Sequence, residues 1–187
     1  MLDLKTININ LPNKQYTQKL IEQHKSNKDK KRVEAEKWTF NQEEYQFENQ
    51  LKIIKDISNN NYNYLDNISK IMFQQISKKI YGYKQQDTIK KIFNEVNFIN
   101  IKSILNKMVE CELKCYYCRK EMLVLYDISR EMKQWSVDRI NKDKGHNLDN
   151  YYLACLECNL KRRRRSDEKF LFTKQLKLVK KDHSLIN

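Results

Sequence analysis

The sequence predicts an α+β protein in which a helical region, residues 1 to 110, precedes a small metal-bound domain, residues 111 to 187. Two observations predict this class. Apolar residues recur every three to four positions through much of the first region, as they do on one face of a helix. The second region holds two C-x2-C pairs and the short β-rich runs "MLVLYD", "WSVDRI" and "YYLAC".

Four helices are predicted in the first region, over residues 47 to 58, 65 to 82, 89 to 96 and 101 to 109, with Asn100 as the N-cap of the last. The scarcity of turn residues supports long helices, because the chain has only two glycines and one proline.

The N-terminal arm differs from these helices. Residues 14 to 38 are polar nearly all round, which fits either an exposed helix or a flexible basic arm. Residues 58 to 64, "SNNNYNY", are typical of a loop between helices.

In the second region strands are predicted over residues 122 to 127, 135 to 140 and 151 to 155. A helix is predicted from Leu156 onward, through "LECNLKRRRRSDEKFLFTKQL". It begins beside the second cysteine pair.

The charge balance points to a polyanionic partner. The formal net charge is +13, from 37 Lys and Arg against 24 Asp and Glu, and nucleic acid is the commonest polyanion for such a balance. Solubility combined with AT-rich codon usage is the alternative explanation. Arginine is more informative, because a guanidinium binds phosphate through two parallel hydrogen bonds. Seven of the eight arginines fall within one 47-residue window: Arg119, Arg130, Arg139, Arg162, Arg163, Arg164 and Arg165.

The sequence predicts an intracellular protein, cytoplasmic or nuclear, with no membrane partner. No run approaches the roughly eighteen apolar residues that span a bilayer. The start, "MLDLKTININLPNK", lacks the layout of a secretory signal peptide. The basic run from Lys161 to Arg165 also fits a nuclear-import signal.

The cysteine pairs predict a structural zinc site. Cys115 with Cys118 and Cys155 with Cys158 form two C-x2-C knuckles, and two knuckles complete a tetrahedral Zn²⁺ site. Two disulfides or free thiols are the alternatives, and an intracellular location disfavours the disulfides. Cys111 is the odd cysteine, expected to be a small buried apolar residue.

The segment clamped between and just after the knuckles carries an ordered set of polar residues: Asp138 on a strand, His146 in a loop, Asn150 opening the next strand and Asn159 after the last cysteine. Residues 111 to 175 resemble the HNH, or ββα-metal, nuclease family, especially its zinc-containing members. The strings "QWSVDRI", "GHNLDN", "CLECNLKRRR" and "FLFTKQL" are similar to those of HNH-like zinc proteins encoded by large DNA viruses of eukaryotes.

The resemblance implies a catalytic divalent ion, Mg²⁺ or Mn²⁺, that contacts the scissile phosphate and the leaving 3′ oxygen. Asp138 and Asn159 match the positions that hold this ion. Asn159 stands where a histidine is more common, although phage junction-resolving members also use asparagine. Asn150 matches the residue that pins the loop backbone, with an ordinary turn asparagine as the alternative.

Arg139 occupies the position of the family's general base. A guanidinium has a pKa above about 12 and cannot accept a proton near neutral pH, but it can bind phosphate. His146 is the candidate substitute, because an imidazole has a suitable pKa. A loop-packing role is its alternative. The resemblance also implies that Lys161, Arg162, Arg163, Arg164 and Arg165 lie against DNA.

Three functions follow from the sequence. The first is a metal-dependent DNA endonuclease that hydrolyses phosphodiester bonds through Asp138, Arg139, His146 and Asn159. The second is a catalytically inactive, zinc-stabilised DNA- or RNA-binding protein. The third is a protein whose zinc domain positions the N-terminal helices against a protein partner.

Overall fold

The computed structural model describes residues 30 to 59 and 66 to 176, and it is α+β, as predicted. The chain divides into two compact units. In the smaller one, residues 30 to 37 pair with residues 127 to 131. Arg32 N donates to Asp127 O at 2.7 Å, and a 3-10 helix, η1 (Ala35–Lys37), follows. Residues 14 to 29 of the predicted arm lie outside the described residues.

The larger unit holds all the features described below, in residues 38 to 59, 66 to 126 and 132 to 176. Its helical half contains η2 (Gln42–Tyr45), α2 (Phe47–Ser58), α3 (Asn67–Ile89) and α4 (Ile101–Glu110). No described helix combines the length and apolar composition that crossing a membrane requires.

Helix α4 confirms its predicted cap. The Asn100 side chain accepts a hydrogen bond from Ser103 N at 2.9 Å, and Ser103 Oγ accepts one from Asn100 N at 3.1 Å. These bonds satisfy backbone donors that the first turn of a helix leaves unpaired, so the helix begins where its sequence predicts.

Helix α3 corrects two predictions. It was expected to end at Gly82 but continues to Ile89, and the separate helix predicted over residues 89 to 96 does not form. The extra turns are stabilised by tertiary contacts, because they bury Tyr83 and Asp87. Lys91, with a φ of 57°, then turns the chain out of the helix.

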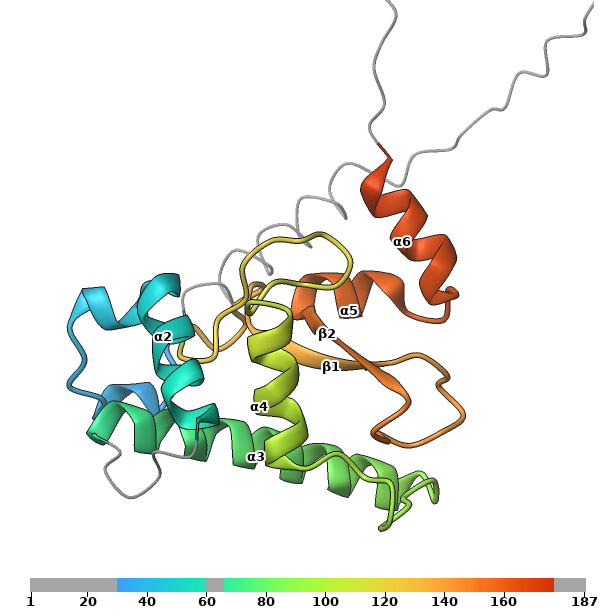
Figure 1. Ribbon diagram of the computed structural model, residues 1–187, viewed down its shortest axis with the longest axis horizontal. Coiled ribbons are helices and arrows are strands. Elements are labelled where there is room, and N and C mark those ends of the chain that lie inside the picture. Colours follow the sequence, from blue (N-terminus) through green and yellow to red (C-terminus); the bar gives the residue numbers. More distant parts are fainter. Residues whose placement is uncertain (1–29, 60–65, 177–187) are drawn as a thin grey trace, which may run out of the picture. The chain divides into compact units, whose positions relative to one another are not determined.

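A two-stranded antiparallel hairpin forms the sheet, with β1 (Trp135–Arg139) paired to β2 (Tyr151–Cys155) in the register Val137↔Leu153. Figure 1 shows α5 (Leu156–Arg162) directly following β2. The strand predicted over residues 122 to 127 forms only an isolated bridge, Leu123↔Gln134.

The helix predicted from Leu156 onward is two helices, α5 and α6 (Asp167–Gln175). Arg163 separates them, because its φ of 50° lies in the left-handed region that a continuing α-helix excludes. Ser166 then caps α6 by accepting from Lys169 N.

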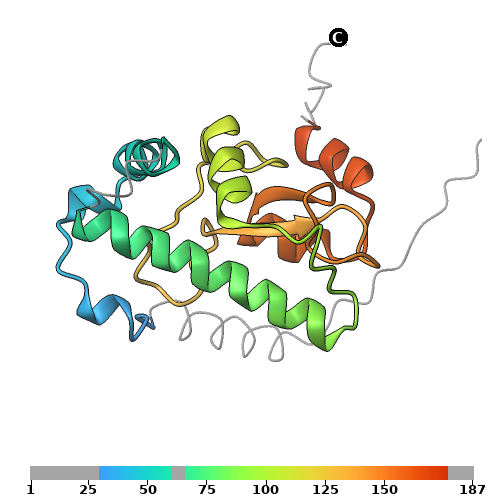
Figure 2. The same ribbon diagram turned by 60° about the horizontal axis from the view of Figure 1, so that its bottom comes forward.

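The apolar core joins the helical half to the hairpin, and Figure 2 shows α3 running alongside it. Tyr83 Oη accepts from Val137 N at 3.0 Å, so α3 covers the edge of β1 that β2 leaves free. Met108 of α4 and Trp135 of β1 belong to the same core cluster. The domain boundary expected between residues 110 and 111 therefore falls inside one compact unit, since the helices bury their apolar faces partly against the hairpin.

Candidate metal centre and phosphate-binding pocket

Two knuckles bring the four predicted cysteines together. In the first, Cys115 N donates to Lys120 O at 2.8 Å and Arg119 N donates to Cys115 O at 2.9 Å, with Arg119 at a φ of 59°. In the second, Cys155 ends β2 and serves as the N-cap of α5, its sulfur accepting from Cys158 N at 3.4 Å. The hairpin and α5 therefore position half of the cluster.

The cluster has the dimensions of a tetrahedral thiolate site. The four sulfur atoms lie within 4.8 Å of one another, and Cys118 Sγ is 3.9 Å from Cys155 Sγ. Zinc–sulfur bonds of about 2.3 Å place tetrahedral sulfurs about 3.8 Å apart. All five cysteines are free, and Cys111, at the end of α4, is outside the cluster. These four residues can therefore hold a metal ion such as zinc.

The thiols of the cluster titrate together. Their mutual hydrogen bonds lower the pKa of Cys115 and raise the pKa of Cys155 and of Cys158, so one thiolate forms first and the other two thiols keep their protons. Because metal coordination requires thiolates, an ion that binds here releases the remaining protons.

A pocket of about 480 Å³ gathers the four candidate catalytic residues, which come from β1, the following loop and α5. Residues of α3, among them Lys79 and Tyr83, form the opposite part of its lining. The four candidates on its wall are Asp138, Arg139, His146 and Asn159.

Asp138 is buried and already has cationic and neutral partners. Arg162 Nη1 donates to both carboxylate oxygens at 2.8 Å, and Tyr117 Oη donates to Oδ2 at 2.7 Å. Burial, and secondarily the charge of Asp138, raise the pKa of the Tyr117 hydroxyl, which keeps it a donor. A divalent ion at Asp138 would have to displace a buried guanidinium.

Asn159 and Asn150 have well-defined partners. Asn159 Nδ2 donates to Ser136 Oγ at 3.1 Å and to Val137 O at 3.2 Å, so α5 is tied to β1. Asn150 Nδ2 donates to Asn141 O and Gly145 O, both at 2.9 Å, and its Oδ1 accepts from Asn141 N at 2.8 Å. Asn150 thus closes the loop between the strands, the geometry that the loop-pinning prediction requires.

His146 lies within that loop and contacts α3. Its Nδ1 is 2.7 Å from Asp87 Oδ1, and its backbone N donates to Asp87 Oδ2 at 2.6 Å. Its ring stacks on Tyr83, with centroids 4.5 Å apart. Burial lowers the pKa of His146 despite the raising effect of Asp87, so the neutral imidazole predominates at neutral pH.

The pocket carries excess positive charge. Lys79, Arg139 and Lys142 line it, whereas the one lining carboxylate, Asp138, is paired with Arg162. The pKa of Lys142 is lowered first by burial and then by the nearby charge of Arg162. Arg139 Nη1 donates to Lys144 O at 3.0 Å. This charge balance suits an anion such as a phosphodiester better than a second metal ion.

The basic residues Lys161 to Arg165 do not form one exposed surface. Arg162 is 1% exposed and donates to Arg139 O and Ile140 O as well as to Asp138, so its guanidinium is not available to nucleic acid in this arrangement. Lys161 pairs with Glu157, and Arg165 donates to Lys161 O.

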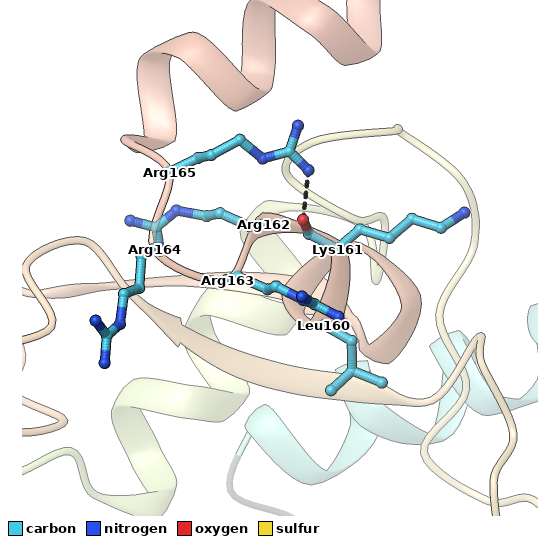
Figure 3. Close-up of a pocket in the computed structure, with 6 residues that line it drawn as sticks. All are labelled: Leu160, Lys161, Arg162, Arg163, Arg164 and Arg165. Atoms are coloured by element: carbon cyan, nitrogen blue, oxygen red, sulfur yellow. Dashed lines mark hydrogen bonds between the residues drawn. The ribbon is translucent and has the colours of Figure 1, made fainter. Parts of the chain in front are cut away.

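Arg163 and Arg164 are exposed, and their guanidinium groups have no hydrogen bond or ion pair among the described residues. Figure 3 shows the basic side chains leaving the end of α5 in different directions. They line an open hollow of about 720 Å³ together with the exposed Leu160.

The sequence analysis did not single out Asp87, and it placed Arg162 at the DNA surface and not beside Asp138. Asp87 continues the buried stripe of Ile76, Ile80 and Tyr83 along α3, and that helical spacing is the signal that could have found it. Arg162 follows Cys158 by four residues, so it shares the buried face of α5. No family model, curated protein or solved structure matches this chain.

Proposed function

We propose that this protein is a zinc-stabilised endonuclease of the HNH type that hydrolyses phosphodiester bonds of nucleic acid, with DNA as the expected substrate. The observation that carries the proposal is the convergence of Asp138, Arg139, His146 and Asn159 on one positively charged pocket. A hairpin followed by a helix, with a four-cysteine cluster at the junction, supports the same family.

The proposed hydrolytic step is assigned to side chains of the pocket. His146 Nε2 accepts a proton from a water molecule, and the water oxygen forms a bond to phosphorus. The bond from phosphorus to the leaving oxygen breaks, its electron pair stays on that oxygen, and the oxygen takes a proton from solvent. Arg139 and Lys142 stabilise the negative charge of the phosphate in the transition state.

The donor atoms of this pocket suit a divalent ion, but Asp138 already has a cationic partner. The oxygens of Asp138 and Asn159 are ligands that Mg²⁺ or Mn²⁺ accepts. Arg162 already neutralises Asp138, however, and a guanidinium does not share a carboxylate easily with a second cation. Requirement for a divalent ion is therefore an outcome of the experiment and not a premise of the proposal.

The experiment is cleavage of supercoiled plasmid, branched DNA and single-stranded DNA by the zinc-loaded full chain, with Mg²⁺, with Mn²⁺ and with neither. His146→Gln removes the proposed base, and Lys102→Gln, on the exposed face of α4, is the control. Cleavage that His146→Gln reduces and Lys102→Gln leaves unchanged supports the proposal. Absence of cleavage on every substrate contradicts it.

A second function is favoured by the Arg162–Asp138 pair, because a pocket whose carboxylate is occupied can bind phosphate without hydrolysing it. This candidate is a zinc-stabilised protein that binds DNA or RNA. Arg163 and Arg164 are its principal phosphate contacts, since both are exposed and unpaired among the described residues.

Salt-dependent binding to duplex DNA tests these contacts. Replacing Arg163 and Arg164 with glutamine should reduce the slope of log K against log salt by about 2, because each phosphate contact contributes about 0.9. Lys52→Gln with Lys70→Gln, on exposed positions of α2 and α3, removes the same charge elsewhere. Equal slopes for the two double variants would show that the end of α5 is not the binding surface.

A further inference from the structure

Asp87 is a buried carboxylate whose partners all belong to the pocket loop. It is 0% exposed, and it lies on α3, outside the segment that carries the candidate catalytic residues. Both of its oxygens bond to His146, Oδ2 through the backbone N at 2.6 Å and Oδ1 through the ring Nδ1 at 2.7 Å. A carboxylate that contacts both the backbone N and the ring Nδ1 of one histidine fixes the orientation of that imidazole.

These contacts determine which ring nitrogen carries the proton. A carboxylate is only an acceptor, so the Nδ1 that faces Asp87 must be the donor. The neutral ring then has its lone pair on Nε2. No described residue hydrogen-bonds Nε2, and Nε2 is not among the wholly buried side-chain atoms that lack a partner. Since His146 lines the pocket, Nε2 is the ring nitrogen left to face it.

The loop is shaped to make this contact. A Cβ at Gly145 would lie 2.8 Å from Asp87 Oδ2 and 2.6 Å from Ile92 O, distances that require something to move. Glycine therefore allows the backbone before His146 to approach α3. Ile99 N also donates to His146 O at 2.9 Å, so the segment that follows α3 holds the other side of the same residue.

We propose that Asp87 is a positioning residue that holds His146 in the Nδ1–H tautomer and directs Nε2 into the pocket as the general base. This inference rests on the proposed hydrolytic function. Helix α3 then takes part in catalysis in two ways. It supplies the Asp87 carboxylate, which orients the base, and it supplies Tyr83, on whose ring the base stacks. Orienting partners of this kind are a general requirement of catalytic and metal-binding imidazoles.

The test combines a spectroscopic and a kinetic measurement on the zinc-loaded full chain. Long-range ¹H–¹⁵N spectra of the histidine side chains, with His146→Gln for assignment, report which nitrogen of His146 is protonated. The same spectra of Asp87→Asn follow, since an amide can donate to Nδ1 as well as accept from it. Asp149→Asn, an exposed carboxylate of the same loop, is the matched control.

We expect the wild type and Asp149→Asn to show the Nδ1–H tautomer and Asp87→Asn to show a larger share of the Nε2–H tautomer. Cleavage by Asp87→Asn should fall at least about 10-fold while DNA affinity stays within about 2-fold, because only the orientation of the base changes. A wild-type His146 with its proton on Nε2 overturns the inference.

Cleavage that Asp87→Asn leaves unchanged overturns the positioning role alone, since the hydrolytic function then stands without it. A wild type that never cleaves overturns the hydrolytic function and the general-base role with it. The spectra distinguish the two failures, because the tautomer is measured whether or not cleavage occurs.

Discussion

Replacing Arg162 with methionine removes a guanidinium that is 1% exposed and that bonds both oxygens of Asp138. The variant leaves Asp138 buried with only the Tyr117 hydroxyl as a partner, and two backbone carbonyls, Arg139 O and Ile140 O, lose their donor. Removal of one member of a buried ion pair costs about 3 to 5 kcal/mol. Since domains are stable by only about 5 to 15 kcal/mol, this is a large share of the total.

Urea unfolding at one fixed zinc concentration measures the effect, because metal bound to the native state adds stability of its own. Arg163→Met is the control. Arg163 is exposed and next in sequence, so its replacement should change the free energy of unfolding by no more than about 0.5 kcal/mol. Asp138→Asn combined with Arg162→Met removes the unpaired charge and should recover part of the loss. An Arg162→Met variant within about 1 kcal/mol of the wild type would refute the buried pair.

Three further predictions concern the metal and the loop. Cys155→Ser should reduce zinc content from about one ion per chain to near zero in metal analysis, and unchanged content would exclude the four-cysteine site. Gly145→Ala should destabilise the protein by about 1 to 3 kcal/mol in urea unfolding, because its Cβ meets Ile92 O and Asp87 Oδ2, whereas a loss below about 0.5 kcal/mol would contradict that contact. Burial lowers the pKa of His146 in the folded state, so the unfolded chain binds more protons and stability should fall as pH drops below about 6.5. His146→Gln should flatten that pH dependence, and an equal dependence in both proteins would assign it to another group.

The four-cysteine cluster and the two strands were predictable because their signals are local. The spacing of each C-x2-C pair predicts a metal-binding knuckle. Val137 and Leu153 lie in β-rich runs on either side of a turn. The start of α4 was predictable because an asparagine side chain at position 100 can cap a helix. Within each cysteine pair, each strand and the cap of α4, the residues that determine the local structure lie within a few positions of one another.

The arrangement of the pocket was less predictable because it depends on contacts far apart in the chain. Gly82 suggests a helix end, but the burial of Tyr83 and Asp87 against the hairpin extends α3 past it. Asp87 and His146 are 59 positions apart, and nothing in the polar run "KQQDTIKK" relates them. In the sequence, Arg162 cannot be distinguished from its basic neighbours. In the structure it lies on the buried face of α5.

In the proposed function, the pocket hydrolyses nucleic acid with His146 as the base. Single-turnover cleavage of labelled DNA by the wild type and by His146→Gln tests this role, with the affinity of both proteins measured in parallel. We expect cleavage by the wild type, a rate about 10²- to 10⁴-fold lower for His146→Gln, and similar affinities. Equal rates, or tight binding by the wild type without cleavage, would contradict it.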